Sequence, residues 1–401
     1  MHTTIRRSHH LLGAILLIAG TTIGVAMIAL PVVTGLAGFI PSLFIMLAVW
    51  LYLFFAALYF VEVNVALKEK VNVISMAEAT IGPLGTVICW SAYLFLLYAL
   101  NTAYMFVTIE LFQEALRFFG QEVSKFFCAL PLLLIFALLF RSGMHLVDII
   151  NRVCMVGFGI SFILLVGLSL PHTQGVYLTT VNMHHMLPAI AVICTAFGYH
   201  IIIPSLVTYL HGNVGELKKA LAIGSFVPFI VYALWQLAVL GNVPAHGDVS
   251  IESALASSTN GAAILAERFG RASIATISKG VVFFAVITSF LGVSISLFDF
   301  LADALHKRKH AAGKWKLFFF CFVPPLYFAL SDPHIFFTAL DYAGTIGVIV
   351  LLALMPAVMA WRKRYVLRLA SPYTAPGGKI GLGIFIAISI ALLGLELLLK
   401  V

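Results

Sequence analysis

Apolar segments long enough to cross a lipid bilayer follow one another along almost the whole chain. A helix rises about 1.5 Å per residue, so roughly 20 apolar residues cross the ~30 Å hydrocarbon layer. Eleven such segments lie at about 11–33, 39–67, 85–110, 125–141, 148–170, 186–210, 219–241, 273–303, 314–330, 335–361 and 380–399. The polar intervals between them are too short for an independent soluble domain. The sequence therefore predicts an all-α membrane protein whose eleven transmembrane helices form one domain over residues 1–401.

The composition excludes a soluble globular protein. Of the 401 residues, 62% are hydrophobic and 10% are charged, and the mean hydropathy is +1.07. The five cysteines all lie in apolar segments, without a CxxC pattern or a Cys/His metal spacing. We therefore expect no disulfide framework, no metal site and no cofactor.

The basic residues predict the orientation in the membrane. If the N-terminus is cytoplasmic, 18 of the 24 Lys and Arg residues fall in the N-terminal tail and the cytoplasmic loops. Lys279 falls just inside a span, and five fall on the other side: Arg117, Lys125, Arg268, Arg271 and Lys400. This asymmetry follows the positive-inside rule and places the N-terminus in the cytoplasm. The net charge of +8 thus describes orientation, and we expect no nucleic-acid partner.

Two other intervals affect the topology. Arg6 and Arg7 precede an apolar run as in an export signal, but no small-residue cleavage site follows and ten more spans do. We interpret this run as a retained first helix. The longest polar interval, 242–271, contains prolines and glycines around helix-compatible stretches and predicts an external helical lid.

Helix-weakening residues interrupt two of the spans. Gly20 and Gly24 lie in the first span, and Gly198 and Pro204 lie in the sixth. Unwound backbone is tolerated in a membrane only where protein or a wet cavity satisfies its N–H and C=O groups, and such breaks suit a zwitterionic ligand. Taken alone, each segment has an equally good alternative explanation. Gly20 and Gly24 form a GxxxG pattern that allows close helix packing, and Pro204 kinks a helix without breaking it.

The positions of the two interruptions favour broken helices that form a binding site. Five spans separate the starts of the interrupted helices, so the second must enter the membrane from the opposite side. This predicts a five-plus-five inverted repeat, with halves at about 11–170 and 186–361 and an eleventh helix at about 380–399. Interrupted helices at matching places in two inverted halves are the best sequence pointer to a secondary-transporter site.

The segments AGTTIGVAMIALP, FGYHIIIPSL and ITSFLGVSISLFDFL resemble the hydroxy and aromatic amino acid permeases, the family of bacterial tyrosine- and tryptophan-specific transporters. The resemblance extends over essentially the whole chain. It implies the five-plus-five fold with broken helices 1 and 6, in a multi-pass protein of the bacterial inner membrane. It further implies a symporter for an aromatic amino acid, first tyrosine and then tryptophan, that works by alternating access on a proton or sodium gradient. Serine or threonine transport is the alternative within the family.

The resemblance also implies a substrate site. The α-amino and α-carboxylate groups would meet the breaks at Gly20–Gly24 and Phe197–His200, and the side chain would lie against the third and eighth spans. On the third span, Tyr98, Asn101 and Tyr104 recur every three residues and share a face. The substrate-binding residues we expect are Gly20, Thr21, Thr22, Gly24, Tyr98, Asn101, Phe197, Gly198, Tyr199, His200 and Ser289.

In sodium-coupled members of the wider fold, hydroxyls of the eighth span and carbonyls of the broken first helix hold a sodium ion. The corresponding oxygens here belong to Gly20, Ile23, Ala285, Thr288 and Ser289. Oxygen ligands suit a hard cation, but serine and threonine in membrane helices also bond to carbonyls of their own helix. The fold's second sodium site needs an asparagine where this chain has Met27.

The same likeness assigns gating residues. Asp341 matches the acid of the external gate, although Leu30 stands near the place of its usual arginine partner. Asp303 matches the acid of the cytoplasmic gate, and Arg6 in the N-terminal tail is its expected partner.

Two titratable residues keep two interpretations each. Glu62 lies near the cytoplasmic end of the second span, where it is either functional or extends toward Lys68 or Lys70. His200 either carries a coupling proton or hydrogen-bonds a phenol, or it makes a structural bond to unwound backbone.

Other classes of protein lack support. A membrane enzyme needs paired carboxylates, a metal set or a nucleophile motif, and the sequence contains none of them; the doublet His184-His185 is the only cluster. A channel is normally lined by repeated like residues, whereas this chain has two asymmetric breaks. We therefore expect a transporter and not an enzyme. Its partners are an amino acid substrate and membrane lipid, and it functions as a monomer.

Overall fold

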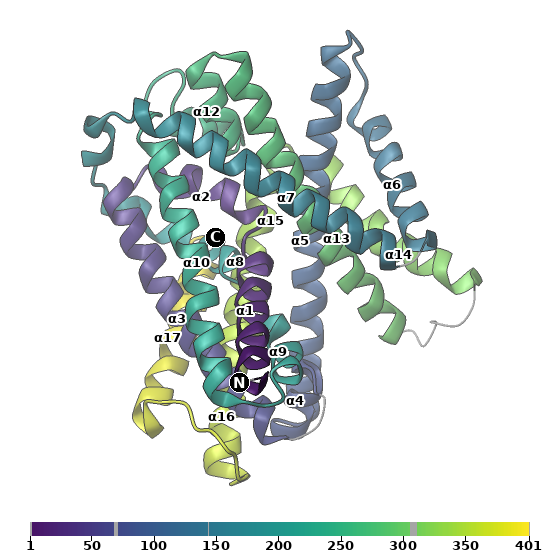
Figure 1. Cartoon of the computed structure of the whole chain (residues 1–401), viewed down its shortest axis with the longest axis vertical. Helices are drawn as coiled ribbons and strands as arrows, with labels where there is room; N and C mark the ends of the chain where they lie inside the picture. Colours follow the sequence, from purple (N-terminus) through teal and green to yellow (C-terminus); the bar gives the residue numbers. More distant parts are fainter. Residues whose placement is uncertain (1, 68–70, 143, 305–310, 401) are drawn as a thin grey trace.

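The computed structural model describes residues 2–67, 71–142, 144–304 and 311–400, with the backbone alone for some of these residues, including 2–9, 139–142, 303–304 and 311–314. In this described part every regular element is a helix (Figure 1). The first half contains α1 (His2–Thr22), α2 (Ala26–Gly35), α3 (Phe39–Ala66), α4 (Val73–Thr80), α5 (Pro83–Phe118), α6 (Lys125–Ser142) and α7 (Met144–Ser169).

The second half follows four short 3-10 turns, η1 to η4, between Leu170 and Ala189. Its elements are α8 (Ile190–Ala196), η5 (His200–Ile202), α9 (Ile203–Tyr209), α10 (Val214–Leu240), α11 (Ile251–Ala256), α12 (Gly261–Phe269), α13 (Ala272–Ala304), α14 (Ala311–Ser331), α15 (Ile335–Tyr342), η6 (Ala343–Leu354), α16 (Met355–Trp361), η7 (Arg362–Val366) and α17 (Gly378–Leu398). The wide π-helical turns of η6 and η7 continue one long helix from Ile335 to Val366.

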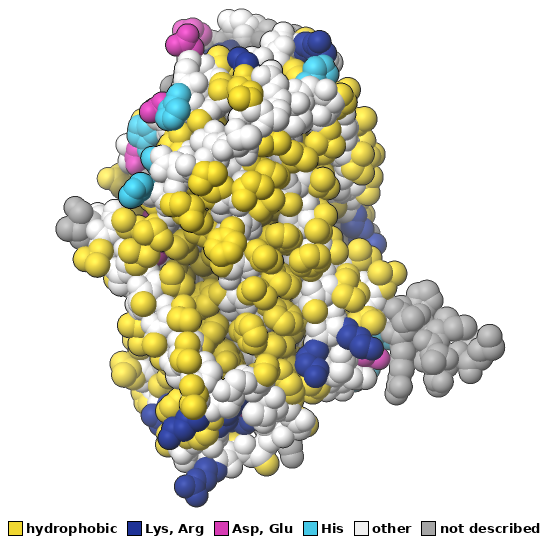
Figure 2. Space-filling model, turned by 90° about the vertical axis from the view of Figure 1, so that its left-hand side faces the viewer, with side chains coloured by type: hydrophobic (Ala, Val, Ile, Leu, Met, Phe, Trp, Pro, Cys, Tyr) yellow, Lys and Arg dark blue, Asp and Glu magenta, His cyan; other side chains and the backbone are white. Residues whose placement is uncertain are grey.

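The lengths and composition of the helices are those of a membrane protein. Within the described residues, eight helices are long and apolar enough to span a membrane, and the bent pair α1–α2 makes up to nine. The apolar parts of α6 and α14 are shorter. Figure 2 shows a broad apolar band around the middle of the molecule, with most charged side chains of that face toward its two ends. An all-helical, multi-pass membrane protein is thus confirmed.

Both predicted interruptions are present. Residues 23–25 separate α1 from α2, and the two helices are bent by 57° at this break. In the sixth predicted span, α8 ends at Ala196 and α9 begins at Ile203, with one 3-10 turn between them. These are the places where glycines and Pro204 weaken the helix.

Packing places the two broken helices among long ones. The helix α10 packs against α1 and α3, while α13 packs against α7 and α5. The last helix, α17, packs on η6 and α16, and the chain's C-terminus lies at about mid-height of the molecule (Figure 1).

The predicted lid is helical. Ser250 caps α11 by accepting from Ser253 N, and Asn260 caps α12 through the N–H groups of Ala262 and Ala263. Such caps satisfy the free N–H groups of a helix start. Figure 1 shows α12 at the end of the molecule opposite α16. The lid packs on α13 and α2.

Candidate functional site at the helix breaks

A single tyrosine joins the two broken helices. The hydroxyl of Tyr232 on α10 lies 2.7 Å from the Thr22 carbonyl oxygen and 2.9 Å from the Ala196 carbonyl oxygen. These are the last residues of α1 and α8, where carbonyls lack a partner within the helix. Tyr232 is fully buried. The carbonyl ends of two half-helices that are far apart in the sequence therefore meet at one hydroxyl, a junction that the sequence analysis missed.

Ser289 lies against the first break. Its Oγ accepts from the Val25 N–H at 3.3 Å, and a Cβ added at Gly24 would lie 2.7 Å from the same Oγ. A glycine is therefore required for α13 to approach the unwound segment this closely. The structure thus brings together two residues that were predicted to share the site.

The other predicted residues of the first break bond within their own helix. The hydroxyls of Thr21 and Thr22 donate to the carbonyls of Leu17 and Ile18, at 2.7 and 2.6 Å. Gly20 lies one turn earlier and faces α7, where a Cβ would contact Met155 at 3.4 Å.

The predicted cation ligands are only partly assembled. The Thr288 hydroxyl lies 2.9 Å from the Phe284 carbonyl oxygen and 3.0 Å from the Ala285 carbonyl oxygen, both on its own helix. Ser289 contacts the break that contains Ile23, through the Val25 N–H. Since a donating hydroxyl oxygen keeps a lone pair for a cation, the cation site stays a prediction.

Aromatic rings pack closely at the second break. The Phe197 ring meets the Tyr232 ring edge-on, with centroids 5.1 Å apart, and the Tyr199 ring stacks on His200 at 4.6 Å. All four side chains are buried. Gly198 faces η6, where an added Cβ would come within 3.3 Å of Val348.

His200 bonds to a neighbouring helix. Its Nε2 lies 2.8 Å from the carbonyl oxygen of Leu53 on α3, so Nε2 carries a proton and donates it. Its Nδ1 is buried and has no hydrogen-bond partner within the described part of the chain. The backbone bond that was expected as one alternative exists, but its acceptor lies on the intact α3.

The predicted residues of α5 face away from the breaks. The Tyr98 hydroxyl donates to the Phe320 carbonyl on α14 at 2.7 Å, and the Asn101 Oδ1 accepts from Ser294 on α13 at 2.8 Å. Tyr104 lies one turn further along and is buried.

The gate residues have a mixed outcome. Asp341 lacks an arginine partner as expected, but Lys400 at the end of α17 pairs with its carboxylate at 2.7 Å. Lys400 also donates to Thr345 at 2.6 Å. The side chains of Arg6 and Asp303 lie outside the described residues.

The expectation that Glu62 extends toward Lys68 or Lys70 is not supported, because its carboxylate is fully buried and already bonded elsewhere. It accepts from Lys363 Nζ at 3.0 Å and from Arg364 Nε at 2.8 Å. The two lysines themselves are outside the described residues. A helix end 301 residues away in the sequence supplies the cations.

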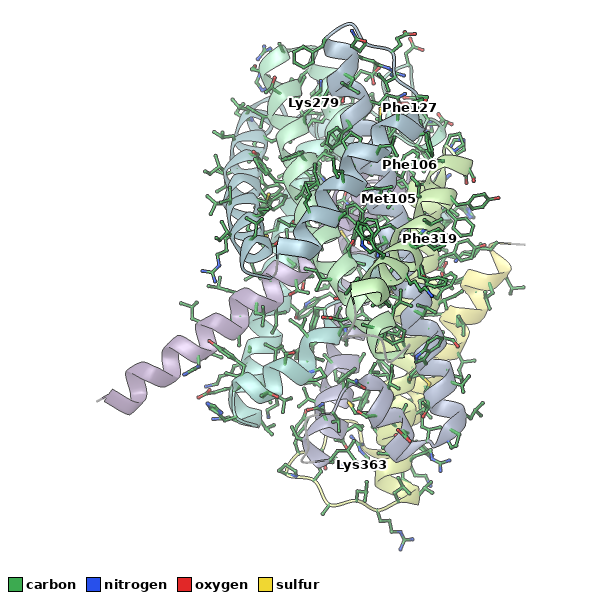
Figure 3. The ribbon with its side chains drawn as sticks, turned by 90° about the vertical axis from the view of Figure 1, so that its right-hand side faces the viewer. Met105, Phe106, Phe127, Lys279, Phe319 and Lys363 are labelled. Atoms are coloured by element: carbon green, nitrogen blue, oxygen red, sulfur yellow. The ribbon has the colours of Figure 1, made fainter. Side chains whose placement is uncertain are left out.

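A loop segment completes this cluster. The N–H of Ala375 donates to Glu62 at 2.8 Å, and Arg364 also donates to the Ala375 carbonyl at 2.9 Å. Burial raises the pKa of the nearby Tyr373 phenol to about 12, so this phenol stays neutral at physiological pH. Figure 3 shows Lys363 near one end of the molecule, where this cluster fastens α3 to η7 and the loop.

A cavity of about 810 Å³ lies toward the other end, between α5, α12 and α13. Ion pairs join Lys125 to Glu110 at 2.5 Å and Lys279 to Glu114 at 2.8 Å along its wall. Phe106 and Lys279 mark this region in Figure 3. No substrate-binding or cation-binding residue from the sequence predictions lines the cavity.

The described residues contain no cluster of three His, Cys, Asp or Glu side chains suited to a metal ion. All five cysteines are buried and unpaired. The breaks therefore offer backbone groups, hydroxyls and aromatic rings for ligand binding.

These features define a multi-pass membrane protein with two interrupted helices joined at a common junction, the arrangement of a permease. The chain belongs to the tryptophan/tyrosine permease family, whose model matches residues 7–396. Two relatives are tyrosine-specific transport systems 1 and 2 of Haemophilus influenzae. The chain is 33% identical to system 1 over 94% of both chains, and 32% identical to system 2 over 97% of this chain and 96% of that one.

A tryptophan-specific transport protein of the same organism is 29% identical, over 96% of this chain and 95% of that one. The family predicted from the sequence is thereby confirmed. Since these relatives are transport proteins, the chain is a permease and not an enzyme.

Proposed function

We propose that this permease imports an aromatic amino acid, first tyrosine and then tryptophan, as a proton- or sodium-coupled symporter. The observation that carries the proposal is the junction at Tyr232, which brings the broken ends of α1 and α8 together. The substrate assignment is supported by relatives that are named as tyrosine- and tryptophan-specific transporters.

The junction suits both charged groups of an amino acid. The unwound backbone at Gly24, which has no side chain of its own, lets an α-carboxylate approach the break, and carbonyl ends such as those of Thr22 and Ala196 attract an α-ammonium group. The ring of Phe197 supplies aromatic surface beside these groups. Such a site recognises the zwitterion through the backbone and leaves specificity to the side chains.

Transport follows alternating access in this proposal. Ten of the eleven spans form the inverted repeats 11–170 and 186–361, the eleventh follows at about 380–399, and the N-terminus lies in the cytoplasm of a bacterium. The broken helices, α3 and α10 move against a scaffold that includes α5 and α13. Arg6 with Asp303 forms the inner gate and Asp341 belongs to the outer gate, while the cavity of about 810 Å³ is the outer vestibule.

Purified protein in liposomes tests this proposal. We expect counterflow of labelled tyrosine to be driven by internal tyrosine and tryptophan, less by phenylalanine, and not by serine, leucine or glutamine. Counterflow with serine as the best substrate would overturn the aromatic assignment. Uphill tyrosine accumulation on an imposed gradient, with chemically unchanged tyrosine recovered, supports a symporter, whereas purely downhill flux contradicts it.

A further inference from the structure

The last helix carries an acid on its protein-facing side. The buried residues of α17 are Leu382, Phe385, Ser389 and Glu396, a spacing of three, four and seven that places them on one face. This face packs against η6 and α16. Glu396 is 1% exposed and is the one ionisable residue among the four. Ionisable residues buried in membrane helices are expensive and usually functional.

Glu396 differs from Glu62 in its partners. The carboxylate of Glu62 has two cations and a backbone N–H. The Oε1 of Glu396 is buried and has no hydrogen-bond partner within the described residues, and its carboxyl group is stabilised by the Ala191 N–H. One carboxyl oxygen of Glu396 is therefore free to hold a proton.

Within the described residues, the charged groups that face Glu396 form one small cluster. These groups are Asp341 on α15 and Lys400 beyond α17, while the thiol of Cys194 faces it from α8. From α3, the neutral phenol of Tyr52 donates to Ser389 two turns away on the same face. The cluster thus contains two carboxyl groups and one ammonium group, and the ammonium group of Lys400 pairs with Asp341 at 2.7 Å.

This charge count favours a bound proton. With both carboxyl groups ionised, the cluster has a buried net charge of −1, which is costly in a membrane protein. One proton on Glu396 makes it neutral. The side chains of Asp341 and Lys400 are 24% and 15% exposed, so they connect the buried acid to water.

The cluster is mechanically connected to the substrate junction. Ala191 and Cys194 lie on α8, whose last carbonyl, that of Ala196, contacts the Tyr232 hydroxyl. Gly344 of η6 lies so close to the Ala191 carbonyl that no side chain fits at this glycine. The short helix α8 therefore transmits a shift at the cluster to the break.

We propose that Glu396 is the proton-binding site that couples amino acid transport to the proton gradient. The proton binds at the free carboxyl oxygen from the Asp341–Lys400 side, which neutralises the cluster and stabilises the packing of α8 on η6 and α17. Release of the proton toward the cytoplasm restores an unpaired carboxylate and favours the other arrangement of α8. This inference rests on the proposed symport and names its coupling site.

The test compares wild type with Glu396→Gln and with Glu78→Gln, an exposed acid on α4 as the control. Proteoliposomes are assayed for tyrosine counterflow, which needs no net proton movement, and for accumulation on an inward proton gradient. We expect Glu396→Gln to keep counterflow within about twofold of wild type. Its accumulation ratio should fall to about one, while the control behaves as wild type.

Proton uptake on tyrosine binding is measured as well, because it tests the site even if the variant transports poorly. Wild type should take up about one proton per tyrosine bound, and Glu396→Gln none, which makes its tyrosine affinity independent of pH. Asp341→Asn leaves Lys400 to pair with Glu396, so the pH dependence of binding should move to lower pH.

Two results separate the possible failures. If Glu396→Gln still accumulates tyrosine on a proton gradient, or if sodium alone drives wild type, the coupling site is wrong and the permease function stands. If wild type shows no counterflow with any aromatic amino acid, the proposed function itself fails.

Discussion

The junction between the two broken helices can be tested by removing one oxygen atom. Tyr232→Phe deletes the hydroxyl that lies 2.7 and 2.9 Å from the Thr22 and Ala196 carbonyls. The ring stays, and so does its edge-on contact with Phe197 at 5.1 Å. The substitution therefore changes the hydrogen bonding of the junction with little change in packing.

The expected magnitude follows from burial. A phenol has one proton, so one hydrogen bond worth about 0.5–1.5 kcal/mol is lost, and buried carbonyls left without a partner raise the cost to about 1–3 kcal/mol. The loss destabilises the conformation in which the ends of α1 and α8 meet, relative to the other conformations of the transporter. A cost of 1–3 kcal/mol corresponds to a shift of about 5- to 150-fold in the conformational equilibrium.

The native cysteine Cys194 reports this shift. It lies on α8 two residues before the junction and is fully buried. In a background whose other four cysteines are replaced by alanine, Tyr232→Phe should increase the rate of Cys194 labelling by a small maleimide about 5- to 150-fold. Tyrosine uptake should fall in parallel.

The matched control is Tyr327→Phe, which removes a hydroxyl from a side chain that is 66% exposed. Its labelling rate and uptake should equal those of the background. If Tyr232→Phe also labels and transports like the background, the hydroxyl does not hold the two ends together and the reasoning is refuted.

Three further substitutions test other contacts. Gly24→Val places a Cβ 2.7 Å from Ser289 Oγ, so uptake should be lost in a folded protein, and normal transport would exclude the first break from the site. Glu62→Gln leaves the cations of the buried cluster without a carboxylate, which should cost about 3–5 kcal/mol and lower the thermal midpoint; an unchanged midpoint contradicts this. If sodium drives uptake, Thr288→Ala should raise the sodium concentration for half-maximal uptake more than it changes tyrosine affinity, whereas uptake that ignores sodium contradicts the cation site.

The helices and their breaks were predictable because they depend on local sequence. Apolar length alone marks a membrane helix, and glycine or proline within it weakens the helix at that point. That Gly24 and Ser289 belong to one site was also expected, although only from the resemblance of both segments to one family. Local sequence thus predicted the breaks, and the family resemblance predicted that α13 takes part in the site at the first break.

The partners of buried polar groups could not be predicted in this way. Glu62 pairs with a cation 301 residues away, and Asp341 pairs with Lys400, which the charge count had only placed on the outer side of the membrane. Each pairing depends on which helix faces pack together. Periodicity gives a buried face but not its neighbour. The same reason explains why Tyr232, a single phenol in an apolar span, gave no signal.

The two buried acids then have different roles for one physical reason. At one end of the molecule, the charge of Glu62 is compensated by two cations, so removing its charge costs stability, and the group fastens α3 to η7. Glu396 shares one ammonium group with a second carboxyl group, so gaining or losing a proton changes its energy without breaking an ion pair of its own. Both acids are equally buried, and the number of cations around each decides which one can change its charge during transport. Glu62 thus provides a fixed attachment for the intact α3, whereas the proposed proton site at Glu396 provides a variable contact for the broken helix at α8.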